Sequence, residues 1–213
     1  MNWDRKMLRL YLITDRSWLG SRSLEDQVEE ALEAGATCLQ LREKHLEEEA
    51  FLAQAVRIKE IAHRHGVPLI INDNLRVALE SGADGLHVGQ GDLQAQKARA
   101  LLGPEKILGV SARTVEQALA AQAAGADYLG VGAVFPTSTK PEAAEVPWET
   151  LGEICRAVEI PVVAIGGITA QRLPQLAGTG IAGAAVISAV FAQPDIPAAV
   201  RGLLAALERT VAP

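Results

Sequence analysis

The chain has 213 residues and a net charge of −6, and apolar residues make up 49% of it while aromatic residues make up 4%. This length allows one well-buried domain or two small ones, and the low aromatic content means a core of Ala, Val, Leu and Ile. The acidic balance provides no basic footprint for nucleic acid, and no apolar stretch approaches the roughly 18 residues that a membrane span requires.

Apolar runs and helical periodicity alternate along the chain. The runs that read as strands buried on both faces cover residues 8–13, 37–41, 68–71, 85–88, 107–110, 128–134, 162–165 and 184–187. Helices are predicted over residues 24–34, 47–65, 75–80, 93–102, 115–124, 148–157, 171–177 and 197–207. The segment Thr114-Val-Glu-Gln117 has the spacing of a capping box, which supports a helix start at that point.

A small-residue phrase recurs before four of the predicted strands, at residues 33–36, 81–84, 124–127 and 179–182. Its glycine suits a helix C-terminus in the left-handed conformation. Eight alternating strand and helix units predict a single (β/α)8 TIM barrel domain over residues 1–213. The alternative is an open doubly wound sheet, which usually has a glycine fingerprint after its first strand, where this chain has Thr14-Asp-Arg-Ser17.

The two cysteines, Cys38 and Cys155, lie in or near apolar runs and do not have the spacing of metal ligands. We interpret them as reduced core thiols, which indicates a cytoplasmic protein. No apolar signal-peptide core occurs before Asp15, so we expect no signal peptide.

Polar residues follow the predicted strands at their C-terminal ends, where barrels of this type place their active sites. The second strand ends in Gln40-Leu-Arg-Glu-Lys44, and the third ends in Ile71-Asn-Asp-Asn74. The next four such segments are His87-Val-Gly-Gln-Gly-Asp92, Gly109-Val-Ser111, Phe135-Pro-Thr-Ser-Thr-Lys140 and Gly166-Gly167. The eighth strand ends in Ile187-Ser188.

Each of these segments has a purely structural interpretation as well. Residues 42–44 are either a solvated charge run or inward-pointing anion ligands, and Asn72 and Asp73 are either a helix cap or part of a site. Asp92 is a second possible cap. His87 is interpreted as a satisfied core histidine or at most a substrate contact. Gly166-Gly167 is either a tight turn or a phosphate-binding backbone.

Taken together, the segments predict two anion sites. Arg42, Lys44 and Lys140, with a metal ion shared by Asp73 and Asp92, suit a pyrophosphate, because Mg²⁺ takes one or two carboxylates together with phosphate oxygens. Gly167, Ser188 and the threonines of residues 137–139 suit a monophosphate. A reaction that joins a monophosphate-bearing molecule to a pyrophosphate-bearing one would need both sites.

These motifs, together with residues 164–168 and 186–188, resemble those of the thiamine phosphate synthase family, and they occur in the family's order across nearly the whole chain. The resemblance implies a (β/α)8 transferase of thiamine biosynthesis. It would join 4-amino-2-methyl-5-hydroxymethylpyrimidine pyrophosphate to hydroxyethylthiazole phosphate, giving thiamine phosphate and pyrophosphate. The implied cofactor is Mg²⁺, and the implied mechanism is a dissociative substitution at the pyrimidine methylene.

The resemblance also implies residue roles. The pyrimidine pyrophosphate would be held by Gln40, Leu41, Arg42, Glu43, Lys44, Asn72, Ser111 and Lys140. The thiazole phosphate would be held by Thr137, Ser138, Thr139, Gly167, Ile187 and Ser188, and Mg²⁺ by Asp73 and Asp92. Arg42, Lys44 and Lys140 would carry catalysis by stabilising the departing pyrophosphate. The family often has a second aspartate where this chain has Asn74.

Two other functions stay open on the sequence. One is a thiazole tautomerase with the same barrel, which would need an acid–base residue and no metal, so the retention of Asp73, Asp92 and Lys140 disfavours it. The other is a non-catalytic barrel that senses thiamine precursors, since binding and catalysis share most residues.

Overall fold

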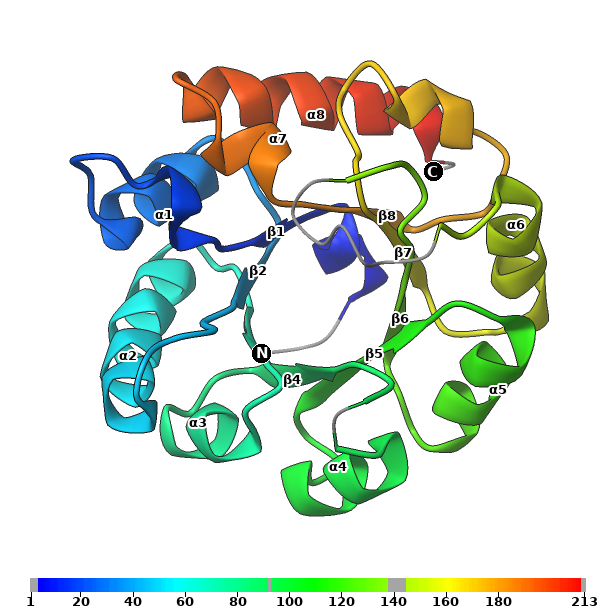
Figure 1. Cartoon of the computed structure of the whole chain (residues 1–213), viewed down its shortest axis with the longest axis horizontal. Coiled ribbons are helices and arrows are strands. Elements are labelled where there is room, and N and C mark those ends of the chain that lie inside the picture. The colour runs from blue at the N-terminus through cyan, green and yellow to red at the C-terminus, as the bar shows by residue number, and fades with distance from the viewer. Residues whose placement is uncertain (1–3, 92, 138–144, 212–213) are drawn as a thin grey trace.

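The strands of the computed structural model, which describes residues 4–91, 93–137 and 145–211, close into a parallel barrel in sequence order (Figure 1). The eight strands are β1 (Leu10–Ile13), β2 (Cys38–Leu41), β3 (Leu69–Asn72), β4 (Gly85–Val88), β5 (Ile107–Ala112), β6 (Tyr128–Val131), β7 (Val162–Ile165) and β8 (Gly183–Val186). β1 pairs with β8 as well as with β2, which closes the sheet. The predicted (β/α)8 barrel is therefore confirmed.

Helices surround the barrel in a ring (Figure 1). They are α1 (Leu24–Glu33), α2 (Glu48–Arg64), α3 (Leu75–Glu80), α4 (Ala95–Leu102), α5 (Val115–Ala123), α6 (Trp148–Ala157), α7 (Ser188–Phe191) and α8 (Ile196–Thr210), with 3-10 turns η1 (Arg5–Leu8), η2 (Arg16–Trp18) and η3 (Leu173–Leu176). None of the helices within the described ranges is long and apolar enough to cross a membrane.

Three predicted features differ in the structure. The helix predicted over residues 171–177 is only the short turn η3, because Pro174 cannot donate a backbone hydrogen bond. The four-residue helix α7 was not predicted, since so short a segment shows no periodicity. At α5 the Thr114 hydroxyl accepts from the Gln117 N–H as expected, but the Gln117 side chain accepts from Arg113 rather than completing a capping box.

Two apolar layers lie on the two faces of the sheet. A smaller cluster inside the barrel includes Tyr11, Cys38, Ile70 and Tyr128, and a larger one packs the outer face of the strands against the helices. Cys38 and Cys155 are both free thiols. Burial raises the pKa of Cys38 well above its usual value and that of Cys155 to about 11, so both thiols stay protonated at neutral pH.

The recurring Gly-Ala-Asp phrase ties neighbouring βα units together at the N-terminal end of the barrel. Before β4, the Asp84 carboxylate accepts from the Leu69 N–H at 2.9 Å and lies 2.8 Å from Nε2 of His63. Before β6, the Asp127 carboxylate accepts from the Leu108 N–H at 2.7 Å and from Arg99 at 2.6 Å. Each aspartate therefore joins the start of the preceding strand to a helix, which indicates a role in stability.

Replacing Asp127 by alanine is expected to lower the free energy of unfolding by about 1–3 kcal/mol, because the Leu108 N–H and the Arg99 guanidinium lose a charged acceptor. Urea denaturation of the variant measures this loss. The exposed Glu153 in α6 offers a control, since its replacement by alanine should change stability by less than 0.5 kcal/mol or so. Equal stability of the two variants would contradict a tethering role for Asp127.

Candidate active site

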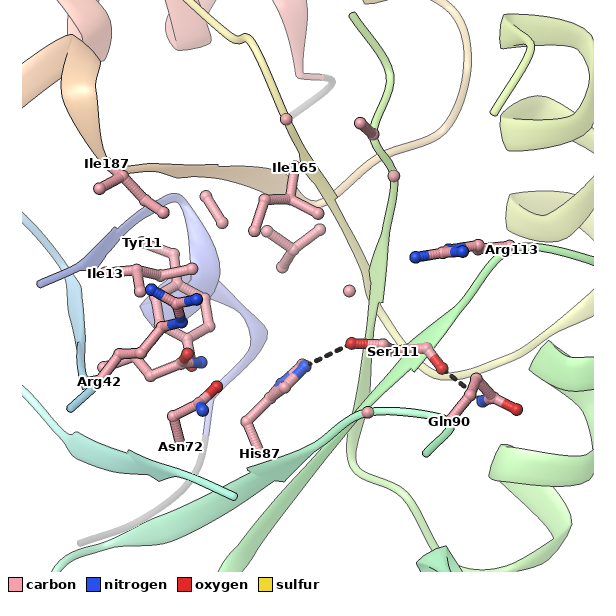
Figure 2. A pocket seen from close by; sticks show the side chains of 18 of the residues that line it. Tyr11, Ile13, Arg42, Asn72, His87, Gln90, Ser111, Arg113, Ile165 and Ile187 are labelled. Atoms are coloured by element: carbon pink, nitrogen blue, oxygen red, sulfur yellow. Dashed lines mark hydrogen bonds between the residues drawn. The ribbon is translucent and has the colours of Figure 1, made fainter. Parts of the chain in front are cut away.

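A cavity of about 550 Å³ opens at the C-terminal ends of the strands. It is lined by residues from every strand of the barrel or the segment that follows it, and Figure 2 shows several of their side chains converging on it. The predicted site residues that line it are Gln40, Arg42, Asn72, Asp73, Ser111, Thr137 and Ile187. Asp92, Ser138, Thr139 and Lys140 lie outside the described residues.

Arg42 is held at the cavity wall by main-chain contacts. Its N–H donates to the Thr14 hydroxyl at 3.0 Å, and the same hydroxyl lies 3.5 Å from the Arg42 carbonyl oxygen. Thr14 itself is fully buried, and its N–H donates to the Gln40 carbonyl oxygen. The Arg42 guanidinium lies 3.8 Å from the Asp15 carboxylate, so β1 and β2 together position this cation.

Three neighbours of Arg42 are placed away from the cavity. Glu43 accepts from Nε of Arg16 at 2.9 Å on both carboxylate oxygens, and only 4% of its side chain is exposed. Leu41 packs in the outer core layer, and Lys44 is exposed and does not line the cavity. Alternation explains Leu41 and Glu43, because successive side chains of an extended segment point to opposite faces, whereas Lys44 lies three residues beyond the end of β2 and does not follow this pattern.

Asp73 has an unusual backbone for a non-glycine residue, with a φ of 60°. Its carboxylate accepts from Nδ2 of Asn72 at 2.6 Å, and its N–H donates to the His87 carbonyl oxygen at 2.9 Å. The left-handed conformation costs an aspartate about 1 kcal/mol or more. Such local strain is typical of functional positions, and here it accompanies a carboxylate that lines the cavity.

Asn74, the departure from the family pattern, has a structural role. Its side chain accepts from the Val77 N–H at 2.9 Å and so caps α3, and its amide donates to Glu48 of α2 at 2.9 Å. The Asn74 amide and the Arg76 guanidinium hold the pKa of Glu48 below its usual value. Asn74 is therefore committed to the joint between α2 and α3.

A smaller cavity of about 30 Å³ lies beside the first and is lined by Thr137, Gly167 and Ile187 among others. Gly166 and Gly167 both have positive φ values, 99° and 60°. A Cβ on Gly167 would lie 2.9 Å from the Phe135 carbonyl oxygen, so only glycine fits this close approach. Ser188 begins α7 directly after Ile187 and lines neither cavity.

Sequence reasoning missed Tyr11 and Tyr128, which line the cavity from inside the barrel. Their hydroxyls lie 2.7 Å apart, and the Tyr128 hydroxyl lies 2.9 Å from Nδ1 of His87. Burial raises the pKa of both phenols well above the usual value, so they are neutral at physiological pH. The signal was available, because these two tyrosines are the only ones in the chain and both lie in predicted strands.

His87 is hydrogen-bonded inside the barrel and also lines the cavity, so its position is compatible with both of its interpretations. Its Nε2 lies 3.0 Å from the Ser111 hydroxyl, and Gln90 donates to the Ser111 carbonyl oxygen at 2.6 Å (Figure 2). Both Ser111 and Gln90 line the cavity.

The described part of the chain contains no cluster of three or more His, Cys, Asp or Glu side chains that could hold a metal ion. Asp73 nevertheless fits a magnesium site of another kind. Mg²⁺ needs only one or two carboxylates when substrate phosphate oxygens and water complete its shell, and Asp73 is one of the residues that line the cavity of about 550 Å³.

Comparison with known proteins adds independent evidence. The family model for thiamine monophosphate synthase matches residues 10–190. The thiamine-phosphate synthase of Ruminiclostridium cellulolyticum is 51% identical over 195 residues, covering 92% of this chain and 93% of its own. Thiamine-phosphate synthase 2 of Streptococcus pneumoniae serotype 4 is 49% identical and covers 94% of this chain and 96% of its own.

Among solved structures, the thiamine phosphate pyrophosphorylase of Pyrococcus furiosus superimposes with a TM-score of 0.90 at 36% identity. The match covers 98% of this chain and 99% of that one. The similarity therefore extends over the whole barrel.

Proposed function

The chain belongs to the thiamine monophosphate synthase family and is a transferase that makes thiamine phosphate, and from this premise we propose how its site works. The larger cavity binds 4-amino-2-methyl-5-hydroxymethylpyrimidine pyrophosphate, and the smaller one binds the phosphate of hydroxyethylthiazole phosphate. The observation that carries the proposal is the convergence of Arg42, Asn72, Asp73 and Ser111 on one cavity, with the Gly167 turn beside it. The barrel over residues 1–213 is proposed to act as one domain.

The proposed reaction is a dissociative substitution at the pyrimidine methylene. Arg42 binds the pyrophosphate and stabilises its negative charge as the C–O bond breaks. The aminopyrimidine delocalises the positive charge left on the methylene carbon. The thiazole nitrogen then attacks this carbon with its lone pair, so the step needs no general base. Holding the two substrates side by side lowers the barrier further, by up to roughly 7–11 kcal/mol.

We propose that Asp73 and Asp92 hold Mg²⁺, which, when bound, neutralises charge on the pyrophosphate oxygens. Asn72 supports this arrangement, because its amide donates to the Asp73 carboxylate and fixes its direction. On sequence grounds Lys140, with Thr139 and Ser138, completes the set of donors to phosphate oxygens. Lys44 is exposed outside the cavity, so a contact with the pyrophosphate would require its flexible side chain to reach over the rim.

A single assay tests the function. The purified protein is mixed with Mg²⁺ and either or both substrates, and release of pyrophosphate is measured. Release only with both substrates present is the expected result, together with thiamine phosphate in equal amount. Binding of both substrates without release would favour the sensor, and conversion of the thiazole substrate alone would favour the tautomerase.

Replacing Asp73 by asparagine is expected to raise the Mg²⁺ concentration needed for half-maximal activity by about tenfold or more, because a neutral amide is a weaker ligand for a hard cation. Mg²⁺ titrations of activity at saturating substrate measure the change. Asparagine also tolerates the φ of 60°, so the variant should fold normally. The same Mg²⁺ requirement in variant and parent would rule out Asp73 as a ligand.

A further inference from the structure

A chain of hydrogen bonds runs across the interior of the barrel beneath the cavity. Gln40 of β2 donates from Nε2 to the Tyr11 hydroxyl of β1 at 2.8 Å, and that hydroxyl lies 2.7 Å from the Tyr128 hydroxyl of β6. The Tyr128 hydroxyl lies 2.9 Å from Nδ1 of His87 on β4, whose Nε2 lies 3.0 Å from the Ser111 hydroxyl of β5. Five strands thus contribute one side chain each.

Two glycines leave room for this chain of hydrogen bonds. A Cβ on Gly109 would collide with the Tyr128 phenol and lie 2.5 Å from Nδ1 of His87, and a Cβ on Gly130 would lie 3.1 Å from the imidazole. Neither glycine has a positive φ, so space rather than backbone conformation favours glycine here, decisively at Gly109 and less strictly at Gly130. The two tyrosines are almost completely buried, at 2% and 0% exposure, and their rings meet edge to face.

The Gln40 amide favours one direction for this chain of hydrogen bonds. An amide nitrogen only donates, so the Tyr11 oxygen accepts from Gln40, and in the direction that we infer its single proton is donated to the Tyr128 oxygen. The Tyr128 proton then goes to Nδ1 of His87. A neutral imidazole that accepts at Nδ1 carries its proton on Nε2, which donates to the Ser111 oxygen. The proton of Ser111 is then available to a ligand in the cavity.

We propose that Gln40, Tyr11 and Tyr128 are positioning residues that polarise this chain, hold His87 as its Nε2–H tautomer and make the Ser111 hydroxyl a hydrogen-bond donor to the pyrimidine substrate. The identity of that substrate rests on the proposed function, whereas the direction of the hydrogen bonds does not. In the opposite direction Ser111 would give its proton to His87 and offer a ligand only an acceptor. Neutral, buried phenols are suited to such a relay because each both donates and accepts.

The direct test is the tautomer of His87, read from two-bond ¹⁵N–¹H correlations of the protein labelled with ¹⁵N-histidine. The His87→Gln variant identifies its signals among those of the four histidines. We expect Nε2–H in the parent protein. Gln40→Glu removes the amide donor, so Tyr11 must donate to the new carboxylate and the whole chain should reverse to Nδ1–H at His87. Nδ1–H in the parent, or an unchanged tautomer in Gln40→Glu, would overturn the inference.

Tyr128→Phe provides a second test of the tautomer, which can be carried out even if Gln40→Glu does not fold. It removes the donor to Nδ1, so the Nε2–H signals should give way to a mixture of both tautomers. Cys38→Ala is the matched control, since Cys38 is fully buried in the same interior cluster and its loss should leave the tautomer unchanged. A tautomer that responds equally to Cys38→Ala and Tyr128→Phe would indicate packing rather than polarity and overturn the inference.

Enzyme kinetics distinguish a positioning role of Tyr128 from a purely structural one. Tyr128→Phe should lower kcat/KM by about tenfold, the worth of one substrate hydrogen bond. In a Ser111→Ala background the same change should have almost no further effect, because the chain then has no donor to position. Full additivity would overturn the inference. A parent protein that makes no thiamine phosphate would contradict the proposed function, while the tautomer would still decide the direction of the chain.

Discussion

Arg42→Ala is expected to lower kcat/KM for thiamine phosphate formation by roughly 10²–10³-fold, the scale of losing one fixed charge partner in the transition state. Arg42 lines the cavity, and Thr14 and Asp15 hold it there before any substrate arrives. A cation positioned in advance need not be reorganised as negative charge develops on the pyrophosphate. The loss should therefore appear mainly in kcat, measured by steady-state release of pyrophosphate.

Two further variants sharpen this test. Arg57→Ala removes an arginine that pairs with Glu25 between α1 and α2, so it controls for the general effect of removing a surface cation. Lys44→Ala tests whether the sequence motif or the cavity geometry better predicts which residues act in catalysis. Lys44 is one of the catalytic residues predicted from the sequence, but it is exposed outside the cavity. The geometry predicts a smaller loss for Lys44 than for Arg42. An Arg42→Ala variant with kcat within threefold of the parent would remove Arg42 from the mechanism.

Much of the site could be predicted because polar residues interrupt apolar strands at their ends. The sequence order of Gln40, Asn72 and Ser111 translates directly into their order around a parallel barrel, on β2, β3 and β5, and all three line the cavity. What the sequence could not provide is side-chain direction beyond the strand. The triplet of residues 42–44 was one predicted unit, yet Arg42 faces the cavity while Glu43 pairs with Arg16 of η2.

The sequence could not predict the chain of hydrogen bonds, for a different reason. Tyr11 and Tyr128 are 117 residues apart in sequence, and their contact depends on closure of the barrel. Each alone is an ordinary apolar strand residue, so periodicity places both in the core without showing that their hydroxyls meet. Gly109 was predicted only as part of a strand-end motif, and its role in making room becomes visible only with the phenol and the imidazole in place.

Gly109→Ala is the second large effect that we expect. The added methyl group would occupy the space of the Tyr128 phenol and the His87 imidazole, which cannot move away because β4 and β6 flank β5 on both sides. Overpacking of this kind costs about 1–3 kcal/mol of stability. Activity should fall further, by about 10²-fold, because the displaced imidazole no longer holds Ser111. Thermal unfolding and steady-state kinetics of the same preparation separate the two losses.

Gly202→Ala is the matched control, because Gly202 lies in the middle of α8 and nothing lies within 4 Å of a Cβ added there. The same one-methyl change should raise stability by roughly 0.5–1 kcal/mol, since alanine favours the helix, and leave kinetics unchanged. The two substitutions should therefore have effects of opposite sign on stability, although each adds only a methyl group. The contradicting outcome is a Gly109→Ala variant with the stability and activity of the parent. It would mean that the barrel interior can accommodate the extra methyl group despite the close contacts around Gly109. It would also mean that the arrangement of His87 is not required for catalysis.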